Sequence, residues 1–231
     1  MLCEDGAGLL VLTGAPEPTG AQSATLVAPQ RMRFGGAEFE LTVHRPSRLL
    51  LADIELVFRP DLAHAHKASG AGYPSRDAFL RERVLLIPLW QPATQDLSVI
   101  SPEVSAERRQ LCMNFVAWIA AVRAQLGGHW LDASDPRSGQ AMFGTPTTAT
   151  YNELDGLTQC LKYHFEPFGC CGIVIHPQWR YNAYPVTVFT TAPLLVLQAA
   201  IEAAAASVAA GALAPAAHVG AIADVGGDEC A

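Results

Sequence analysis

The sequence predicts an α+β fold with a mainly antiparallel central sheet packed by helices. Polar and apolar residues alternate in residues 37–43 and 184–190, as they do in half-buried strands. Between Ser101 and Leu126 apolar residues recur at a spacing of three and four, which is typical of one helix face. The connections between such segments are short and local, which favours antiparallel strands with helices packed on them.

The 231 residues are enough for one substantial domain, and half of them are hydrophobic. We expect a single α+β domain over residues 31–213. Residues 1–30 are rich in Gly, Pro, Ala, Ser and Thr and predict a poorly ordered lead, with one short strand at residues 9–13. Residues 214–231 predict a mobile tail.

The first half of the domain predicts further strands. Residues 49–58 alternate from Asp53 onward and predict a strand that pairs with residues 37–43 as an antiparallel hairpin. Residues 84–90 are strongly apolar, and their Pro88 predicts an edge strand or a bulge. His64 and His66 stand two apart without further ligand residues nearby, so a solvent-facing loop or helix start is favoured over a metal site.

The second half predicts two long helices and a defined turn. Ser101 followed by Pro102 and an acid predicts a helix start, and Gly127 with Gly128 predicts its end. The Asp-Pro-Arg-Ser-Gly sequence of residues 135–139 predicts a turn. Residues 157–165 predict a short strand or helix. Residues 194–214 predict an alanine-rich helix packed on the domain rather than a membrane span, because the segment carries Glu202 and little strongly apolar bulk.

Charge and cysteine content exclude several classes of protein. The net charge of −7 and the absence of a Lys/Arg cluster argue against nucleic-acid and anionic-membrane partners. The six cysteines form no CxxC pair, which favours free thiols in a reducing compartment. The first thirty residues show neither a signal-peptide pattern nor an arginine-rich leader, so we expect a cytoplasmic protein, with a mitochondrial location as the alternative.

Two adjacent cysteines, Cys170 and Cys171, stand between Gly169 and Gly172 at the start of an apolar run. The run to His176 predicts a strand, in which Cys171 shares the core face and Cys170 shares the other face with His176. A disulfide between neighbours is disfavoured, because Cα atoms about 3.8 Å apart are too close for ordinary bridge geometry. We therefore predict one presented thiol, Cys170, and one buried thiol; two buried core cysteines are the alternative.

Two segments resemble the cobalamin-trafficking CblD family, the methylmalonic aciduria and homocystinuria type D proteins. The segment from His129 to Gly144 resembles the family's aromatic-to-DPxSGxAFFG motif. The segment from Phe168 through His176 to Trp179 resembles its LGCC…H..W motif. The resemblance covers about residues 84–191 and is weak before them, and the alanine-rich C-terminal helix is longer than the family's tail.

The resemblance implies a flavin-reductase/nitroreductase-like fold used without flavin and a protein that is not an enzyme. It implies a metallochaperone-type adaptor whose partner, a CblC-type protein, holds cob(II)alamin, and whose Cys170 gives a thiolate to cobalt. Gly169, Cys171, Gly172, His176 and Trp179 would support this cysteine. Glu153 and Asp155 match acidic family positions that order the loop or shape the partner surface. Methionine synthase, methylmalonyl-CoA mutase or both would receive the cofactor, and proteins of the methionine synthase branch would be further partners.

Three other functions compete with this interpretation. A cysteine enzyme would use Cys170 as nucleophile, His176 as base and Asp155 as orienter, but on a straight strand Cys170 and His176 lie about 20 Å apart. A flavin-type oxidoreductase would share the fold, which does not by itself carry that function. A thiol redox protein would form a reversible bridge between Cys170 and Cys171.

Overall fold

The computed structural model describes residues 22–168 and 171–211. Five strands form an antiparallel sheet in the order β1-β2-β3-β7-β4, and β5 and β6 form a separate antiparallel pair. The strands are β1 (Ala24–Phe34), β2 (Ala37–Arg45), β3 (Leu85–Pro92), β4 (Leu131–Ala133), β5 (His164–Phe168), β6 (Cys171–Ile175) and β7 (Ala183–Thr190). The helices are α1 (Arg48–Val57), α2 (Arg59–Ala68), α3 (Arg76–Arg83), α4 (Pro102–Gln125), α5 (Glu153–Leu161) and α6 (Leu194–Ala209), with a 3₁₀ turn η1 (Gly70–Gly72). The predicted α+β class with an antiparallel sheet is confirmed; the nitroreductase-like resemblance stays a prediction.

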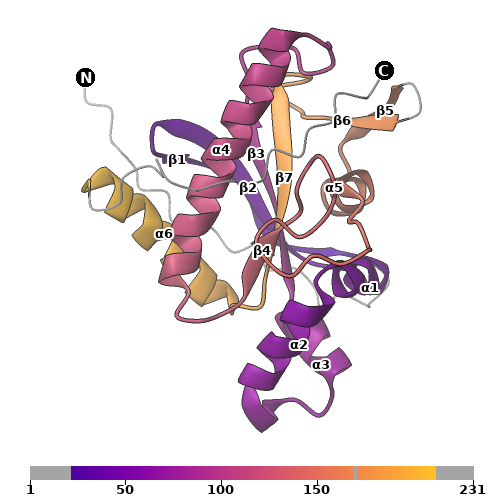
Figure 1. The fold of residues 1–231 in the computed structure, drawn as a ribbon, viewed down its shortest axis with the longest axis vertical. Coiled ribbons are helices and arrows are strands. Elements are labelled where there is room, and N and C mark those ends of the chain that lie inside the picture. The colour runs from indigo at the N-terminus through magenta and orange to yellow at the C-terminus, as the bar shows by residue number, and fades with distance from the viewer. Residues whose placement is uncertain (1–21, 169–170, 212–231) are drawn as a thin grey trace.

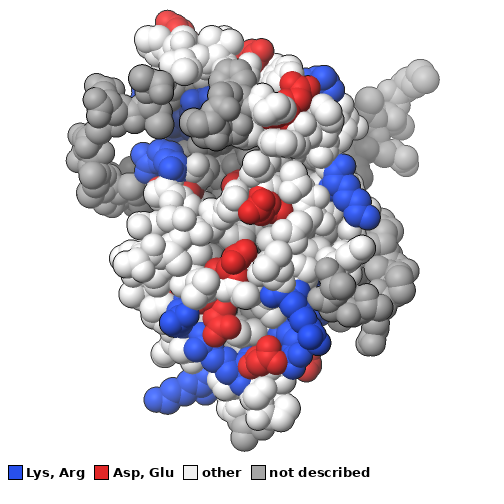
Figure 2. Space-filling model, turned by 90° about the vertical axis from the view of Figure 1, so that its right-hand side faces the viewer, with Lys and Arg blue, Asp and Glu red and all other residues white. Residues whose placement is uncertain are grey.

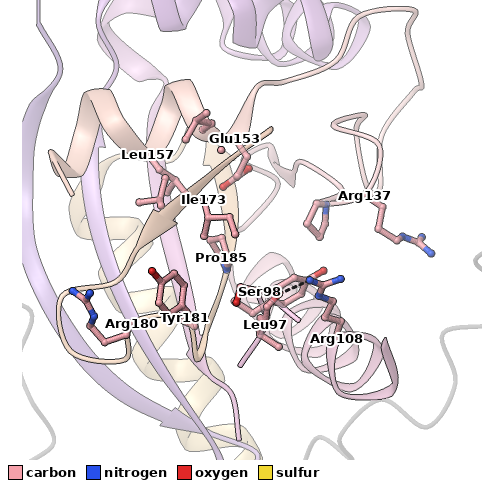
Figure 3. Close-up of a pocket in the computed structure, with 16 residues that line it drawn as sticks. Leu97, Ser98, Arg108, Arg137, Glu153, Leu157, Ile173, Arg180, Tyr181 and Pro185 are labelled. Carbon is pink, nitrogen blue, oxygen red and sulfur yellow. Dashed lines mark hydrogen bonds between the residues drawn. The ribbon is translucent and has the colours of Figure 1, made fainter. Parts of the chain in front are cut away.

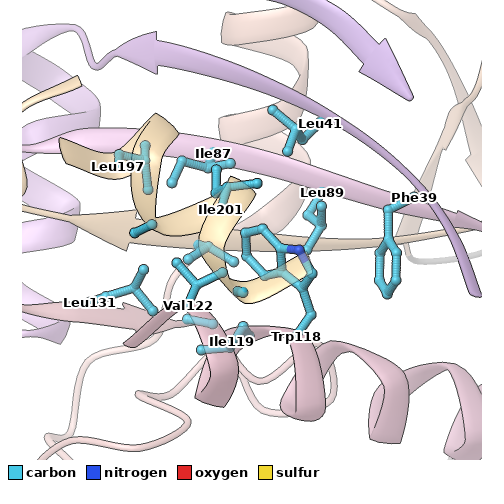
Figure 4. Close-up of a cluster of buried hydrophobic side chains, with 14 of the residues drawn as sticks. Phe39, Leu41, Ile87, Leu89, Trp118, Ile119, Val122, Leu131, Leu197 and Ile201 are labelled. Atoms are coloured by element: carbon cyan, nitrogen blue, oxygen red, sulfur yellow. The ribbon is translucent and has the colours of Figure 1, made fainter. Parts of the chain in front are cut away.

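Helices α4 and α6 cover one face of the sheet (Figure 1). Their apolar side chains, among them Trp118, Val122 and Ile201, pack against alternate residues of the central strands such as Ile87 and Leu89 (Figure 4). Trp118 and Ile87 are fully buried. Because strand side chains alternate between faces, this core uses every second residue of β3.

The intervening residues of β3 face a second core. Leu86, together with Val84 directly before the strand, packs with Phe189 of β7 and with the buried faces of α1, α2 and α3. Cys160 of α5 also belongs to this cluster. The sheet is therefore covered by helices on both faces, and its middle strands are buried throughout.

The prediction of a strand at residues 49–58 is wrong, because this segment is α1. Ser47 caps the helix by accepting a hydrogen bond from the Leu50 amide at 3.2 Å. The residues that α1 buries are spaced as on a helix face: Leu50, Leu51, Ile54 and Val57. Leu56, which the alternating pattern placed in the core, is 47% exposed. A short apolar run does not distinguish a helix from a strand.

The hairpin partner of β2 is β1, which begins at Ala24 inside the predicted lead. Phe34 pairs with Ala37 across the two-residue turn Gly35-Gly36, whose φ values are +57° and +86°. Positive φ at both central positions is the geometry that a tight type I′ hairpin requires, and glycine adopts it without strain. Residues 24–30 thus belong to the sheet rather than to the lead. The predicted strand at residues 9–13 and the predicted tail from residue 214 lie outside the described residues.

Pro88 lies in the third of five strands, so the predicted edge position or bulge is wrong. It pairs with Thr187 of β7. On its other side the ladder between β2 and β3 is interrupted between the pairs Leu41–Leu89 and His44–Leu86 without a change of register. The strand therefore accommodates the missing N–H donor by leaving out ladder bonds locally.

Several predicted elements are confirmed with their end signals. The Ser101 hydroxyl accepts from the Val104 amide at the start of α4, and Gly127 follows its end with φ of +60°. The turn after Asp135 is closed by a bond from the Gly139 amide to the Asp135 carbonyl at 2.7 Å. The segment predicted as strand or helix contains both, the end of α5 and the start of β5. Among the described helices none is long and apolar enough to cross a membrane.

Candidate functional site

The double cysteine belongs to the β5–β6 hairpin, which projects from the side of the five-stranded sheet (Figure 1). The last pair of the hairpin, at its outer end, joins Phe168 to Cys171. Cys170 and Gly169 lie outside the described residues, as does the side chain of Cys171. The described strand starts at Cys171 and ends at Ile175, next to the buried His176.

Gly172 lies where side chains of the hairpin and of α5 approach the backbone of β6 closely. A Cβ atom at this position would lie 2.0 Å from Cε2 of Phe165 and 2.9 Å from Cδ2 of Leu154. The space beside the backbone at this glycine is filled by the Phe165 ring of the neighbouring strand. The hairpin and α5 are thereby held in close contact.

His176 anchors the base of the hairpin to the main sheet. Its Nδ1 accepts hydrogen bonds from the backbone amides of Gln178 and Trp179 at 3.3 and 3.2 Å. Its Nε2 therefore carries the proton and donates to Oε1 of Glu40 on β2 at 3.0 Å. Both ring nitrogens are used in structural bonds, so His176 does not offer a free nitrogen to act as a base for a cysteine.

An aromatic stack completes this anchor, which we call the His176 clamp: His176, Glu40, Trp179, Arg31 and Trp90. The His176 and Trp179 rings are stacked with their centroids 4.4 Å apart. The guanidinium carbon of Arg31 lies 5.1 Å from the centroid of the Trp179 ring. Trp90 of β3 lies 5.1 Å from His176. Burial alone raises the pKa of Glu40, but the bond from His176 and the nearby Arg31 outweigh it and lower that pKa below its ordinary value.

Tyr163, directly before β5, contacts the same clamp with its ring 5.6 Å from that of His176. Burial, and then the nearby Glu40 carboxylate, raise the pKa of Tyr163 to about 12. Both ends of the hairpin are therefore attached at one place on the main sheet. The outer end, where β6 begins at Cys171, is the part farthest from this attachment along each strand.

Glu153 and Asp155 lie in the first turn of α5 but have different surroundings. Oε2 of Glu153 accepts from the Ser134 hydroxyl at 2.8 Å, and Oε1 accepts from the hydroxyl of Thr187 on β7. Burial raises the pKa of Glu153 to about 7, even though both hydroxyl bonds favour the charged form. Asp155 is exposed and accepts from the amide of Asn152, the cap of the helix, at 2.8 Å.

A pocket with a cavity volume of about 410 Å³ lies behind β6, with the Glu153 carboxyl in its wall (Figure 3). Gly172, Ile173 and Val174 of β6 form one side of it. The opposite side comes from β7 and from the loop before α4. The pocket thus adjoins the strand that begins with the second cysteine.

Sequence reasoning found Glu153, His176 and Trp179 but missed their partners. Glu40 lies 136 positions before His176, and Thr187 lies 34 positions after Glu153. No local spacing connects such residues, and Glu40 looks like an ordinary solvent-facing acid of an alternating strand. The pairing of β2 with β3 brings Glu40 beside Trp90 and thereby to the end of the hairpin.

Within the described ranges no group of three or more His, Cys, Asp or Glu side chains is arranged to hold a metal ion. His64 and His66 lie in α2, with His64 exposed and His66 packed 5.2 Å from Phe79. On the side of the molecule shown in Figure 2, acidic and basic side chains are interspersed.

Comparison with known proteins shows the family to which the chain belongs. Residues 24–200 match the family model described as methylmalonic aciduria and homocystinuria type D protein, so the chain belongs to this family. It is 28% identical over 163 residues to the cobalamin trafficking protein CblD of Mus musculus and equally to that of Homo sapiens. The alignment covers 69% of this chain and 48% of each relative, so the chain spans about half the length of the curated relatives it matches.

Proposed function

We propose that this protein is a non-catalytic adaptor in cobalamin trafficking. In this role it binds a CblC-type partner that holds cob(II)alamin, and the Cys170 thiolate becomes a ligand of cobalt. The observation that carries the proposal is a family match that spans the hairpin with the double cysteine. Relatives whose names describe cobalamin trafficking support the same role.

The hairpin geometry supports presentation of a thiol to a second protein. Cys171 opens β6 at the outer end of a two-stranded unit that is attached to the main sheet at its opposite end by the His176 clamp. A rigid base limits the motion of the outer end, which lowers the entropy lost on binding. Cys170 precedes Cys171 directly and is the cysteine that we propose as the ligand of cobalt.

The chemistry of cobalt supports a single cysteine as a sufficient ligand. The deprotonated sulfur is the species that binds metal ions, and a nearby metal charge favours its deprotonation. The corrin ring supplies the equatorial nitrogens, so one axial position is available for one protein ligand. A structural zinc site would instead require four protein groups.

The destination of the cofactor follows from the same proposal. We infer delivery to methionine synthase in the cytoplasm as the main branch, with methylmalonyl-CoA mutase in the mitochondrion as the second. A nitroreductase-like fold that holds no flavin is the architecture we expect for this adaptor. Purified protein without visible flavin absorbance is the corresponding expectation.

The test mixes the full chain with a CblC-type partner carrying cob(II)alamin and follows the visible spectrum. We expect a change typical of thiolate–cobalt coordination with the unaltered chain, its loss in Cys170→Ser, and its retention in Cys171→Ser. Equal loss in both variants would refute the separate roles of the two sulfurs. A disulfide between Cys170 and Cys171 formed under mild oxidant, with no spectral change at cobalt, would favour a thiol redox protein instead.

A further inference from the structure

The pocket behind β6 is bounded by the edges of two strands. Its walls include three consecutive residues of β6, residues 172–174, and three consecutive residues of β7, residues 183–185. Successive side chains of a strand point to opposite faces, so a wall made of three consecutive residues includes the main chain itself. The main-chain edges of β6 and β7 therefore face the same pocket.

In the described part of the chain neither of these edges is paired with a further strand. β6 pairs with β5 alone. β7 pairs with β3 along its whole length, but β4 on its other side pairs only with residues 188–190. Residues 183–186 of β7 therefore have no neighbouring strand on the side of the pocket. Open strand edges of this kind are the positions at which a sheet accepts another strand.

On β7 the free main-chain groups belong to Ala183 and Pro185. The Ser134 amide donates to the Thr187 carbonyl at 3.1 Å, so the main-chain groups of Thr187 point away from β3. Main-chain groups alternate in direction along an antiparallel strand, so those of residues 183 and 185 point the same way. Ala183 thus offers an N–H and a C=O on this edge, and Pro185 offers a C=O.

On β6 the free main-chain groups belong to Gly172 and Val174. Pro167 of β5 pairs with Gly172 and has no N–H, so this pair is one that exchanges no main-chain hydrogen bonds. Gly172 and Val174 therefore direct their N–H and C=O groups away from β5. Ile173, between them, directs its own groups toward Glu166 of β5. Donors and acceptors are thus available on both sides of the pocket for the main chain of one extended segment.

Arginines stand on both sides of the same pocket. Figure 3 shows Arg108 and Arg180 at opposite sides of it. In the part of the chain that the structure describes, neither forms an ion pair with a carboxylate. Arg108 is half-buried and donates to the Leu97 carbonyl at 2.5 Å, and Arg180 is exposed. Two separated cations are complementary to an extended segment with acidic side chains at both ends, and not to one small anion.

The acid in the wall of the pocket is compatible with such a segment. Glu153 is held by the hydroxyls of Ser134 and Thr187. Burial raises the pKa of Glu153 to about 7, so at neutral pH about half of these carboxyls carry no charge. The arginines therefore dominate the charge that a ligand of the pocket meets.

We propose that this pocket is the docking site for an extended, acidic segment of the partner protein, which pairs with the open edge of β6 as an added strand. The acidic side chains of the segment pair with Arg108 and Arg180. The inference rests on the proposed function for the identity of the partner, a CblC-type protein. Because β6 begins at Cys171, a strand bound along it brings the partner to the end of the hairpin at the double cysteine.

Residue-resolved amide hydrogen exchange tests the added strand directly. The full chain is measured alone and in complex with a CblC-type partner that carries cob(II)alamin. We expect exchange at Gly172, Val174 and Ala183 to slow at least about tenfold in the complex, because their N–H groups gain acceptors. Ile173 should change less than about twofold, since its N–H already faces β5. Equal protection of all four amides, or protection of none, would overturn the inference.

Substitutions test the two kinds of contact separately, with the affinity of the complex measured by biolayer interferometry. Ala183→Pro removes one donor from the open edge and keeps the pairing with β3, because this N–H points away from β3. It should weaken the complex about tenfold and leave the midpoint of urea denaturation unchanged. If the midpoint falls, the exchange pattern of the unaltered chain decides instead.

The charge contacts are tested at the two arginines. Arg108→Gln and Arg180→Gln should each weaken the complex about threefold to tenfold, and the effect should shrink as salt is raised. Arg109→Gln is the matched control, because Arg109 is an exposed arginine of α4 outside the pocket, and it should leave the affinity unchanged. Equal affinities of the Arg108→Gln and Arg109→Gln variants would overturn the acidic segment.

Failure of this inference and failure of the proposed function give different results. Cys170→Ser should lose the spectral change at cobalt and keep the protection at Gly172 and Val174. An unchanged spectrum in Cys170→Ser would refute thiolate coordination, whereas a complex with the spectral change but without this protection would refute the docking strand alone. Protection of the same amides in the chain alone at raised concentration would assign the pocket to a second copy and overturn the inference.

Discussion

Replacing Glu153 with Gln should change how stability depends on pH. Burial raises the pKa of Glu153 to about 7, from an ordinary value of 4.5. At a pH between 4.5 and about 7, the Glu153 carboxyl is ionised in the unfolded chain and protonated in the folded chain. The free energy of unfolding therefore falls as pH rises from 4.5 through 7, and the stability present below 4.5 is lost above the folded pKa. The difference corresponds to about 3 kcal/mol, at roughly 1.4 kcal/mol per pH unit.

Glu153→Gln removes this titration and can retain a bond from one of the two hydroxyls. We expect the stability of the variant, relative to the unaltered chain, to rise by about 3 kcal/mol between pH 4.5 and 8. Urea denaturation at four pH values, followed by tryptophan fluorescence, measures the difference. Asp155→Asn, which alters an exposed acid in the same helix turn, is the matched control. A constant difference for Glu153→Gln would refute the view that burial controls this carboxyl.

Three further changes test the hairpin, its attachment to the main sheet and a helix cap. Gly172→Ala should disrupt the hairpin, because its methyl group would overlap Phe165; faster amide exchange confined to β5 and β6 would be the observation. His176→Asn should release the base of the hairpin and cost about 1–3 kcal/mol by leaving Glu40 buried without its donor, as urea denaturation would show. Ser101→Ala should lower stability by about 1 kcal/mol through loss of the α4 cap, with Ser105→Ala in the same helix as the control.

Local signals in the sequence predicted the elements whose stabilisation is itself local. The cap and glycines of α4 and the alternation of β7 are properties of neighbouring residues, and these elements were found with their ends. Residues 49–58 were misassigned because their apolar pattern fits both periods over ten residues. The helical conformation of α1 is favoured by the packing of its buried face against α2 and α3, which lie later in the chain.

Only the part of the candidate site that is local in sequence could be predicted. The double cysteine and His176 lie within seven residues and form a motif, whereas the clamp depends on Glu40 and Arg31, which strand pairing brings from the other end of the domain. The residues that line the pocket could not be predicted from the sequence. Its arginines come from α4, from the turn after β4 and from the loop before β7, and none of them is distinctive in its own segment.

The clamp and the pocket act on opposite ends of the same five-residue strand. His176 follows the last residue of β6 and is fixed through Glu40 to the main sheet, while Gly172 near its first residue packs against α5 through Leu154. α5 begins at Glu153, whose carboxyl is bound to β7. A ligand that displaces or draws on Glu153 therefore acts on the helix that supports the outer end of the hairpin.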